Sequence, residues 1–302
     1  VDTSVLTVDD PLSSVISKLL TKTPAERYAS ATECIVALSQ ALGQEPPAET
    51  VALRESFIQA AEFVGRQREL QQLKDALQKA ISGTGSAWLV GGESGVGKSR
   101  LLDELRTQAL VEGALVVRGQ AVEGGGLPYQ LWREPLRRLV LSVELSDLEA
   151  GILKPIVPDI ATLLERNILD APELPGEAGQ QRLTLTIADV FKRHTQPVAL
   201  LLEDLQWSSE SLEPLKRLSE MSGKLPLLIV ANYRSDEFPN LPDELPDTTP
   251  IPLPRLSDAE IAELSAGMLG ESGRDPAIIE RLQQETEGNT FFMVEVVRAL
   301  AE

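Results

Sequence analysis

The sequence has almost no cysteine or histidine: Cys34 and His194 are the only residues of their types among 302. A single cysteine cannot form a disulfide within the chain, and neither residue has partners at the spacing of a zinc site. We interpret Cys34 as a small apolar residue on a helix and His194 as a surface or capping residue. The sequence therefore argues against a structural zinc site and against a histidine-based catalytic triad.

Long apolar runs are also missing, since none approaches the roughly 18 residues that a membrane-spanning helix requires. The first ten residues, VDTSVLTVDD, have neither the charged nor the apolar region of a secretory signal. We therefore expect a cytoplasmic protein without a membrane partner. The chain has no initiator methionine and ends within the apparently helical FFMVEVVRALAE, so we expect a piece of a longer protein.

Basic residues are outnumbered, with 28 Lys and Arg against 46 Asp and Glu and a net charge of −18. An acidic chain repels phosphate backbones, so nucleic acid is not expected as a partner. The largest basic cluster runs only from Arg133 to Arg138. The chain is nevertheless long enough to bury the core of one or two domains.

The pattern of predicted elements divides the chain into four parts. Residues 1–42 predict helices, residues 43–59 an interdomain linker, residues 60–254 an alternation of helices and short apolar strands, and residues 255–302 a helical tail. The predicted helices of the third part are 69–81, 99–111, 130–143 and 180–192, and its strands are 87–90, 115–117, 198–202 and 227–231. We also expect an edge strand within 238–254 and a capping box at Ser257–Glu260. Apolar strands separated by helices are typical of a parallel sheet covered on both faces.

Residues 92–99 read GESGVGKS, which fits the phosphate-binding pattern G-x-x-x-x-G-K-[ST] between a predicted strand and a predicted helix. The loop has three glycines, Gly92, Gly95 and Gly97, which let backbone N–H groups approach phosphate oxygens. The start of the following helix adds its dipole. Lys98 supplies an ammonium for the β- and γ-phosphates, and Ser99 a hydroxyl for Mg²⁺. The alternative is a glycine-rich turn without a ligand.

The loop predicts ATP and Mg²⁺ as cofactors, with further nucleotide contacts from Val96 and Arg100. A P-loop also needs an acid at the end of a neighbouring strand, and Glu203 and Asp204 follow the apolar run 198–202. Adjacent residues of a strand point to opposite faces, so the two acids have different roles. We predict that Glu203 faces Mg²⁺ and that Asp204 orients the attacking water. The alternative for one of them is a helix cap near Ser208.

The next predicted strand ends in Asn232, Tyr233 and Arg234. An Arg or Asn there could reach the γ-phosphate from within the same subunit, and we predict a catalytic role for Arg234. The alternative is a surface arginine at a strand end.

Three segments, in this order, resemble the bacterial branch of AAA-type ATPases found in signalling proteins, the STAND class, which is related to origin-recognition ATPases. They are FVGRQREL at 63–70, LLEDLQW at 201–207, similar to the Walker B segment, and EGNTFF at 287–292, similar to part of the helical lid. The resemblance covers 62–302 and implies an α/β, parallel-sheet P-loop NTPase core of the AAA type with a C-terminal helical lid. It also implies that Val64, Gly65 and Arg66 contact the adenine side. Glu203 stands where the family usually has Asp, and Thr290 where it has Pro.

Residues 19–28, LLTKTPAERY, resemble the last helices of a bacterial Ser/Thr protein kinase domain, although a chance helical hairpin is the alternative. No kinase Gly-rich loop, H-R-D or D-F-G occurs, so this stretch cannot phosphorylate a substrate by itself. The resemblances imply the ATPase and lid of a signalling protein whose neighbouring kinase and C-terminal regulatory domains respond to ATP or ADP.

Three functions follow as alternatives. The first is an ATPase that drives signalling, the second is a switch or scaffold that holds nucleotide and hydrolyses little, and the third is an origin-type DNA loader. The net charge of −18 argues against the third. A homo-oligomer whose assembly depends on nucleotide is compatible with the first two.

Overall fold

The structure, a computed structural model, describes residues 11–21, 23, 26–28, 31–43, 63–124, 127–208 and 211–301. The chain divides into two compact units, Ala61–Val297 and a smaller one made of Val1–Ala60 with Arg298–Glu302. In the smaller unit, α1 (Pro11–Leu19) and α2 (Ala31–Ala41) are helical, as the sequence predicts. Residues 44–59 of the predicted linker, and residues 22, 24 and 25 of the kinase-like segment, lie outside the described residues.

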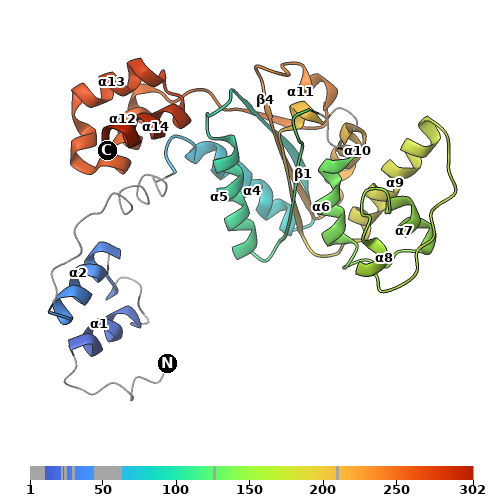
Figure 1. Cartoon of the computed structure of the whole chain (residues 1–302), viewed down its shortest axis with the longest axis horizontal. Helices are drawn as coiled ribbons and strands as arrows, with labels where there is room; N and C mark the ends of the chain where they lie inside the picture. Colours follow the sequence, from blue (N-terminus) through green and yellow to red (C-terminus); the bar gives the residue numbers. More distant parts are fainter. Residues whose placement is uncertain are drawn as a thin grey trace. The chain divides into compact units, whose positions relative to one another are not determined.

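A five-stranded parallel sheet forms the centre of the larger unit (Figure 1). Its strands are β1 (Ser86–Gly92), β2 (Leu115–Gln120), β3 (Val198–Glu203), β4 (Leu227–Arg234) and β5 (Thr249–Pro252), in the spatial order β2-β3-β4-β1-β5. The parallel α/β fold class predicted from the apolar runs is confirmed, and β5 is the edge strand expected within 238–254. Because all strands are parallel, their carboxyl ends meet at one edge of the sheet, where the loop that begins at Gly92 lies.

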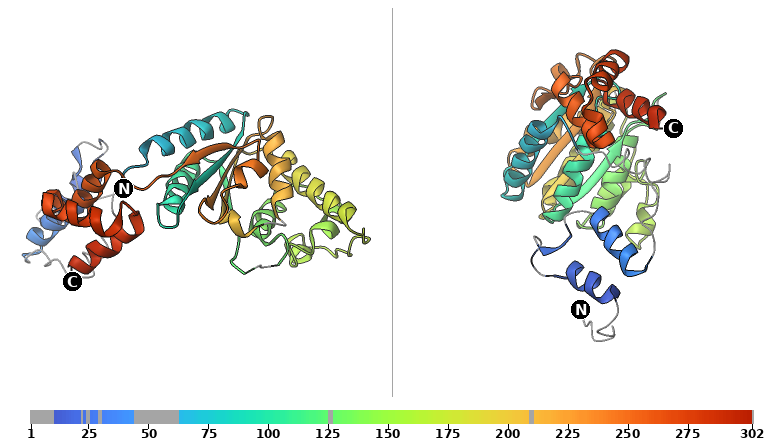
Figure 2. Two further views of the ribbon diagram at one scale, coloured as in Figure 1. Left: turned by 90° about the horizontal axis from the view of Figure 1, so that it is seen from above. Right: turned by 90° about the vertical axis from the view of Figure 1, so that its left-hand side faces the viewer.

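Helices cover both faces of this sheet (Figure 1, Figure 2). One face packs against α4 (Gln67–Ile81) and α5 (Lys98–Val111), and the other against α6 (Gln130–Leu139), α9 (Glu177–Arg193) and α10 (Leu212–Ser222). Strand residues alternate between the two buried clusters: Leu201 packs on the α4–α5 side, and Leu200 and Leu202 on the other. Since side chains alternate along a strand, Glu203 points to the α5 side.

The sequence prediction differs from the structure in the layer formed by α6, α9 and α10. Helix α6 ends at Leu139 rather than at residue 143, and a turn closes it with a hydrogen bond of 2.9 Å from the Ser142 N–H to the Leu139 carbonyl. His194, expected at the surface or as a cap, follows α9 and is buried, with its Nδ1 3.1 Å from the Gln196 carbonyl. His194 is the C-cap of α9, as one of the two expectations has it, and the surface assignment was wrong because the chain turns directly into buried β3.

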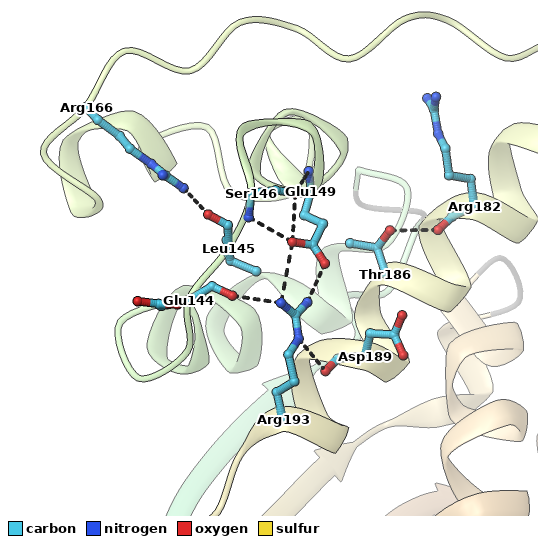
Figure 3. A network of polar contacts seen from close by, with 9 residues as sticks. All are labelled: Glu144, Leu145, Ser146, Glu149, Arg166, Arg182, Thr186, Asp189 and Arg193. Carbon is cyan, nitrogen blue, oxygen red and sulfur yellow. Dashed lines mark hydrogen bonds and ion pairs between the residues drawn. The ribbon is translucent and has the colours of Figure 1, made fainter.

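Short helices α7 (Asp147–Leu153) and α8 (Ile160–Leu163) lie between α6 and α9. Figure 3 shows the polar network that joins α9 to this segment. The Arg193 guanidinium donates to the Glu144 carbonyl at 2.7 Å and to the Glu149 carboxylate at 2.5 Å, while Glu149 caps α7 through the backbone N–H of Ser146 at 2.8 Å. Each of these groups is paired, so the network holds the segment in place.

Three helices follow the sheet: α12 (Asp258–Leu269), α13 (Pro276–Thr286) and α14 (Thr290–Ala301). The capping box at their start is present, with the Ser257 N–H donating to the Glu260 carboxylate at 2.7 Å. The described residues also form the helix α11 (Leu241–Glu244) and the 3₁₀ turns η2 (Leu205–Trp207) and η4 (Gly270–Arg274). Among the residues described, no helix has the length and apolar character needed to cross a membrane.

Candidate functional site

The glycine-rich loop connects β1 to the first turn of α5. Gly95 and Gly97 have φ values of 82° and 99°, a region that glycine adopts without the strain other residues meet. Gly97 is the N-cap of α5, so Lys98 is the first helical residue. The loop therefore presents a helix N-terminus, which favours an anion.

The Lys98 side chain is buried within this loop. Its ammonium donates to the carbonyl oxygens of Gly92 at 2.8 Å and Glu93 at 2.7 Å. Burial lowers the pKa of Lys98, and the nearby charge of Arg234 lowers it further, while Asp236 and Asp204 act in the opposite direction. A phosphate would give this partly desolvated ammonium the charged partner that backbone carbonyls do not supply.

Glu203, the last residue of β3, and Asp204, which follows the strand, have different surroundings. The Glu203 side chain is only 9% exposed and forms an ion pair with Arg118 of β2. Asp204 adopts a left-handed conformation with φ 61°, and its carboxylate accepts hydrogen bonds from Gln120 at 3.0 Å and Gln206 at 3.3 Å. Asp204, unlike Glu203, is among the carboxylates whose charge acts on Lys98.

Asn232 lies at the end of β4, beside these acids. It is 1% exposed, and its Oδ1 accepts the Asp204 N–H at 3.0 Å. Its Nδ2 is buried and has no hydrogen-bond partner within the described part of the chain. A buried amide donor without a partner is costly, so this group is available to a bound oxygen atom.

Arg234, at the last position of β4, is turned toward other protein groups. Its guanidinium pairs with Glu237 at 2.5 Å and lies 5.0 Å from the centre of the Trp207 ring. The same pairing raises the pKa of Arg234 above its usual value. Arg234 is close enough to act on the charge of Lys98, and its predicted role at the γ-phosphate stays a prediction.

The segment predicted at the adenine side packs against the loop and against residues 254–256, which precede α12. Val64 and Arg66 are buried, and the Arg66 guanidinium donates to the carbonyls of Val96, at 3.4 Å, and of Pro254. A Cβ on Gly65 would lie 2.7 Å from the Leu256 side chain. Arg66 therefore ties three segments together. Arg100, by contrast, is exposed on α5 and pairs with Glu104 at 2.8 Å, so its nucleotide contact also stays a prediction.

The turn between α13 and α14 contacts the loop directly. The Asn289 amide donates to the Ser94 carbonyl at 2.8 Å, and its Oδ1 accepts the N–H groups of Phe291 at 3.1 Å and Phe292 at 3.4 Å, which caps α14. The Phe291 N–H also lies 3.0 Å from the Gly95 carbonyl. A Cβ on Gly95 would lie 2.5 Å from Asn289 Oδ1, so glycine is needed there for close approach as well.

Arg255 joins the same elements through charge. Its guanidinium pairs with Glu93 of the loop at 2.9 Å and with Glu287 at the end of α13. The sequence predicts no role for Arg255 or Asn289, because their partners are distant in sequence. Only the likeness of EGNTFF to a lid motif points to this region. A pocket of about 420 Å³ opens beside these groups, lined among others by Gly92, Glu93 and Arg255.

The residues near the loop fit a magnesium ion. Ser99 is exposed on the first turn of α5, and Glu203 points to the α5 side of the sheet. The described residues contain no group of three or more His, Cys, Asp or Glu able to hold a metal ion by themselves. Mg²⁺ usually binds through one or two carboxylates, water and substrate phosphates, and the hydroxyl and carboxylate oxygens present are its preferred type.

The chain is similar to known proteins in sequence and in structure. Residues 62–230 match the family described as AAA ATPase domain. An uncharacterized protein of Rhizobium meliloti (strain 1021) is 25% identical over 197 residues, which are 57% of this chain and 18% of that protein. A chain in the structure of Drosophila ORC bound to DNA has a TM-score of 0.54 at 13% identity, over 85% of this chain and 62% of that one.

The ORC1 protein of Aeropyrum pernix, solved in complex with DNA, has a TM-score of 0.48 at 16% identity, over 80% of this chain and 60% of that one. The likeness to the Drosophila chain shows a shared fold. In each case the match spans less than two thirds of the relative's own length.

Proposed function

The chain belongs to the AAA ATPase domain family, and on that premise we propose that loop 92–99 binds ATP with Mg²⁺ and that the site hydrolyses the ATP. The observation that carries the proposal is the buried Lys98 ammonium inside a loop that opens a helix, where its hydrogen-bond partners are backbone carbonyls. A triphosphate satisfies both the ammonium and the helix N-terminus.

The hydrolytic roles follow from the surroundings of each side chain. Ser99 and Glu203 would hold Mg²⁺, which neutralises charge on the β- and γ-phosphates when bound. Asp204, oriented by two glutamines, orients the attacking water and accepts its proton. The free Nδ2 of Asn232 donates to the γ-phosphate or to that water, and Arg234 responds to the γ-phosphate.

We further propose that nucleotide controls the lid. Carbonyl oxygens of the loop accept hydrogen bonds from the turn 289–291, while the loop N–H groups are the ones that phosphate would use. Any change in the loop on phosphate binding therefore acts on Asn289 and on the Arg255 bridge. Adjacent domains of the same chain, and a nucleotide-dependent homo-oligomer, would receive the signal.

A second candidate is a switch or scaffold that holds ATP or ADP and hydrolyses it slowly. The ion pair between Glu203 and Arg118 favours it, because that carboxylate already has a cationic partner. Single-turnover release of phosphate separates the two: retained binding without release over hours supports the scaffold. The likeness of residues 19–28 to a kinase supports a larger kinase–ATPase protein, which kinase motifs upstream in the complete chain would test.

Replacing Lys98 with alanine should weaken ATP binding by roughly 10- to 150-fold, because hydrogen bonds to charged groups contribute about 1.5–3 kcal/mol. The measurement is a calorimetric titration of ATP with Mg²⁺. Lys224→Ala removes an exposed lysine outside the site and serves as the control. An unchanged dissociation constant for ATP in Lys98→Ala, with the control also unchanged, would contradict the proposed function.

Replacing Asn289 with alanine should speed amide exchange at Phe291 and Phe292 and weaken ATP binding, each by about fivefold, since a lost helix cap costs about 1 kcal/mol. Hydrogen exchange by mass spectrometry measures the first effect. Asn240→Ala is a matched control, because Asn240 precedes α11 without a capping hydrogen bond from its side chain. Faster exchange with unaltered ATP affinity would separate the lid from nucleotide binding and contradict the coupling.

A further inference from the structure

We propose that Arg118 controls the access of a divalent cation to Glu203: it holds the carboxylate while the site lacks metal, and it releases Glu203 but keeps its contact with Asp103 when metal binds. The inference rests on the proposed nucleotide function and deepens it. It makes Arg118 a positioning residue for the metal.

The position of Arg118 follows from strand register. Gln120 of β2 pairs with Glu203 of β3, and Arg118 pairs with Leu201. Val116 and Leu201 pack in the cluster on the α5 side, so Arg118 and Glu203 extend from neighbouring strands toward the same helix. The guanidinium therefore reaches the Glu203 carboxylate from the edge strand.

The second acceptor of Arg118 comes from α5. Its Nη1 lies 3.0 Å from the Asp103 carboxylate, while Nη2 pairs with Glu203. Asp103 is four residues after Ser99, so the two side chains lie on one side of the helix that begins at the loop. Arg118 thus bridges the helix that carries the predicted hydroxyl ligand of the metal and the strand that carries its predicted carboxylate ligand.

The two partners of Arg118 differ in exposure, which gives the exchange a direction. The Asp103 side chain is 49% exposed, so water solvates its carboxylate and it does not depend on Arg118 for a counter-charge. The Glu203 side chain is only 9% exposed. A buried carboxylate needs a counter-charge, because desolvation without pairing is costly. Arg118 supplies that charge in the absence of metal. A divalent cation supplies it instead when bound, and Asp103 then retains the guanidinium, which remains charged at all accessible pH values.

If Arg118 and metal compete for Glu203, substitutions of Arg118 and of Asp103 should change Mn²⁺ affinity in opposite directions. Arg118→Met frees Glu203 and should tighten Mn²⁺ binding to the ATP-loaded protein by roughly 10- to 100-fold, the range in which neighbours of metal ligands act. Asp103→Asn weakens the second partner, leaves Arg118 on Glu203, and should weaken Mn²⁺ binding by a few-fold. Neither change should alter ATP affinity in EDTA, where no metal is bound.

The test uses the complete chain with ATP and Mn²⁺ as the probe, and electron paramagnetic resonance counts free Mn²⁺. Arg106→Met, an exposed arginine of α5, is the matched control and should leave Mn²⁺ affinity unchanged. A purely structural role for Arg118 would lower the unfolding midpoint without tightening Mn²⁺ binding. If Arg118→Met does not fold, the sign of the Asp103→Asn effect decides.

Unchanged or weaker Mn²⁺ binding in Arg118→Met, or tighter binding in Asp103→Asn, overturns the inference. If either of these outcomes occurs while the unaltered chain binds ATP in EDTA, the inference about Arg118 is wrong and the proposed function still stands. Failure of the unaltered chain to bind ATP under any condition overturns the proposed function and the inference together.

Discussion

Replacing Asp204 with asparagine should lower the rate of ATP hydrolysis by about 10²–10⁴-fold, the usual contribution of a positioned general base. Asparagine has nearly the same shape and cannot accept a proton. The two glutamines and the Asn232 side chain that hold Asp204 lie on neighbouring elements, so the loop that binds phosphate is not disturbed. ATP affinity should therefore stay within about threefold of the unaltered protein.

Single-turnover release of phosphate is the measurement, since it separates hydrolysis from nucleotide exchange. Asp243→Asn, at an exposed site on α11, is the matched control. Glu203→Gln gives the complementary comparison: its effect should depend on metal concentration, and that of Asp204→Asn should not. A hydrolysis rate of Asp204→Asn equal to that of the unaltered protein would show that Asp204 is not the general base.

Replacing Asn232 with alanine should lower the hydrolysis rate by about 10²–10³-fold, as loss of one donor at a developing negative charge does in other enzymes. Two interactions disappear together: the free Nδ2 donor, and the acceptor that holds the Asp204 N–H at 3.0 Å. The backbone at Asp204 has φ 61°, a strained value for a residue with a side chain, so loss of this acceptor also loosens the base.

Asn232→Thr separates the donor from simple space filling. A hydroxyl both donates and accepts, so the threonine variant should retain more activity than alanine. The unfolding midpoints of both variants show whether the buried site tolerates the change. Equal activity of Asn232→Ala and the unaltered protein, at equal stability, would mean that the unpartnered amide has no part in hydrolysis.

The fold could be predicted from the sequence because its signals are local. Continuous apolar runs between helices predict buried parallel strands. The loop motif lies between a predicted strand and a predicted helix, which is the context in which it binds phosphate. The sequence does not predict helix α10, and it predicts the end of α6 at residue 143 instead of Leu139, since these boundaries depend on packing against the sheet. The burial of His194 has the same cause.

The site could be predicted only in part, because its remaining contacts join residues far apart in the chain. Asn289 and Ser94 are separated by 195 positions, and no sequence period relates them. Arg118 has the sequence character of an ordinary polar residue on an edge strand. Its partner becomes evident only from the pairing of β2 with β3 and from the direction in which Glu203 points.

We propose that the loop 92–99 binds a nucleoside triphosphate. The most direct measurement records backbone amide signals of isotope-labelled protein by nuclear magnetic resonance during titration with ATP and Mg²⁺. We expect the amides of Gly95, Gly97 and Lys98 to shift and to saturate at one ATP per chain, with ADP competing and AMP leaving them unchanged. Unshifted loop amides at millimolar ATP, or shifts confined to other parts of the protein, would contradict nucleotide binding at this loop.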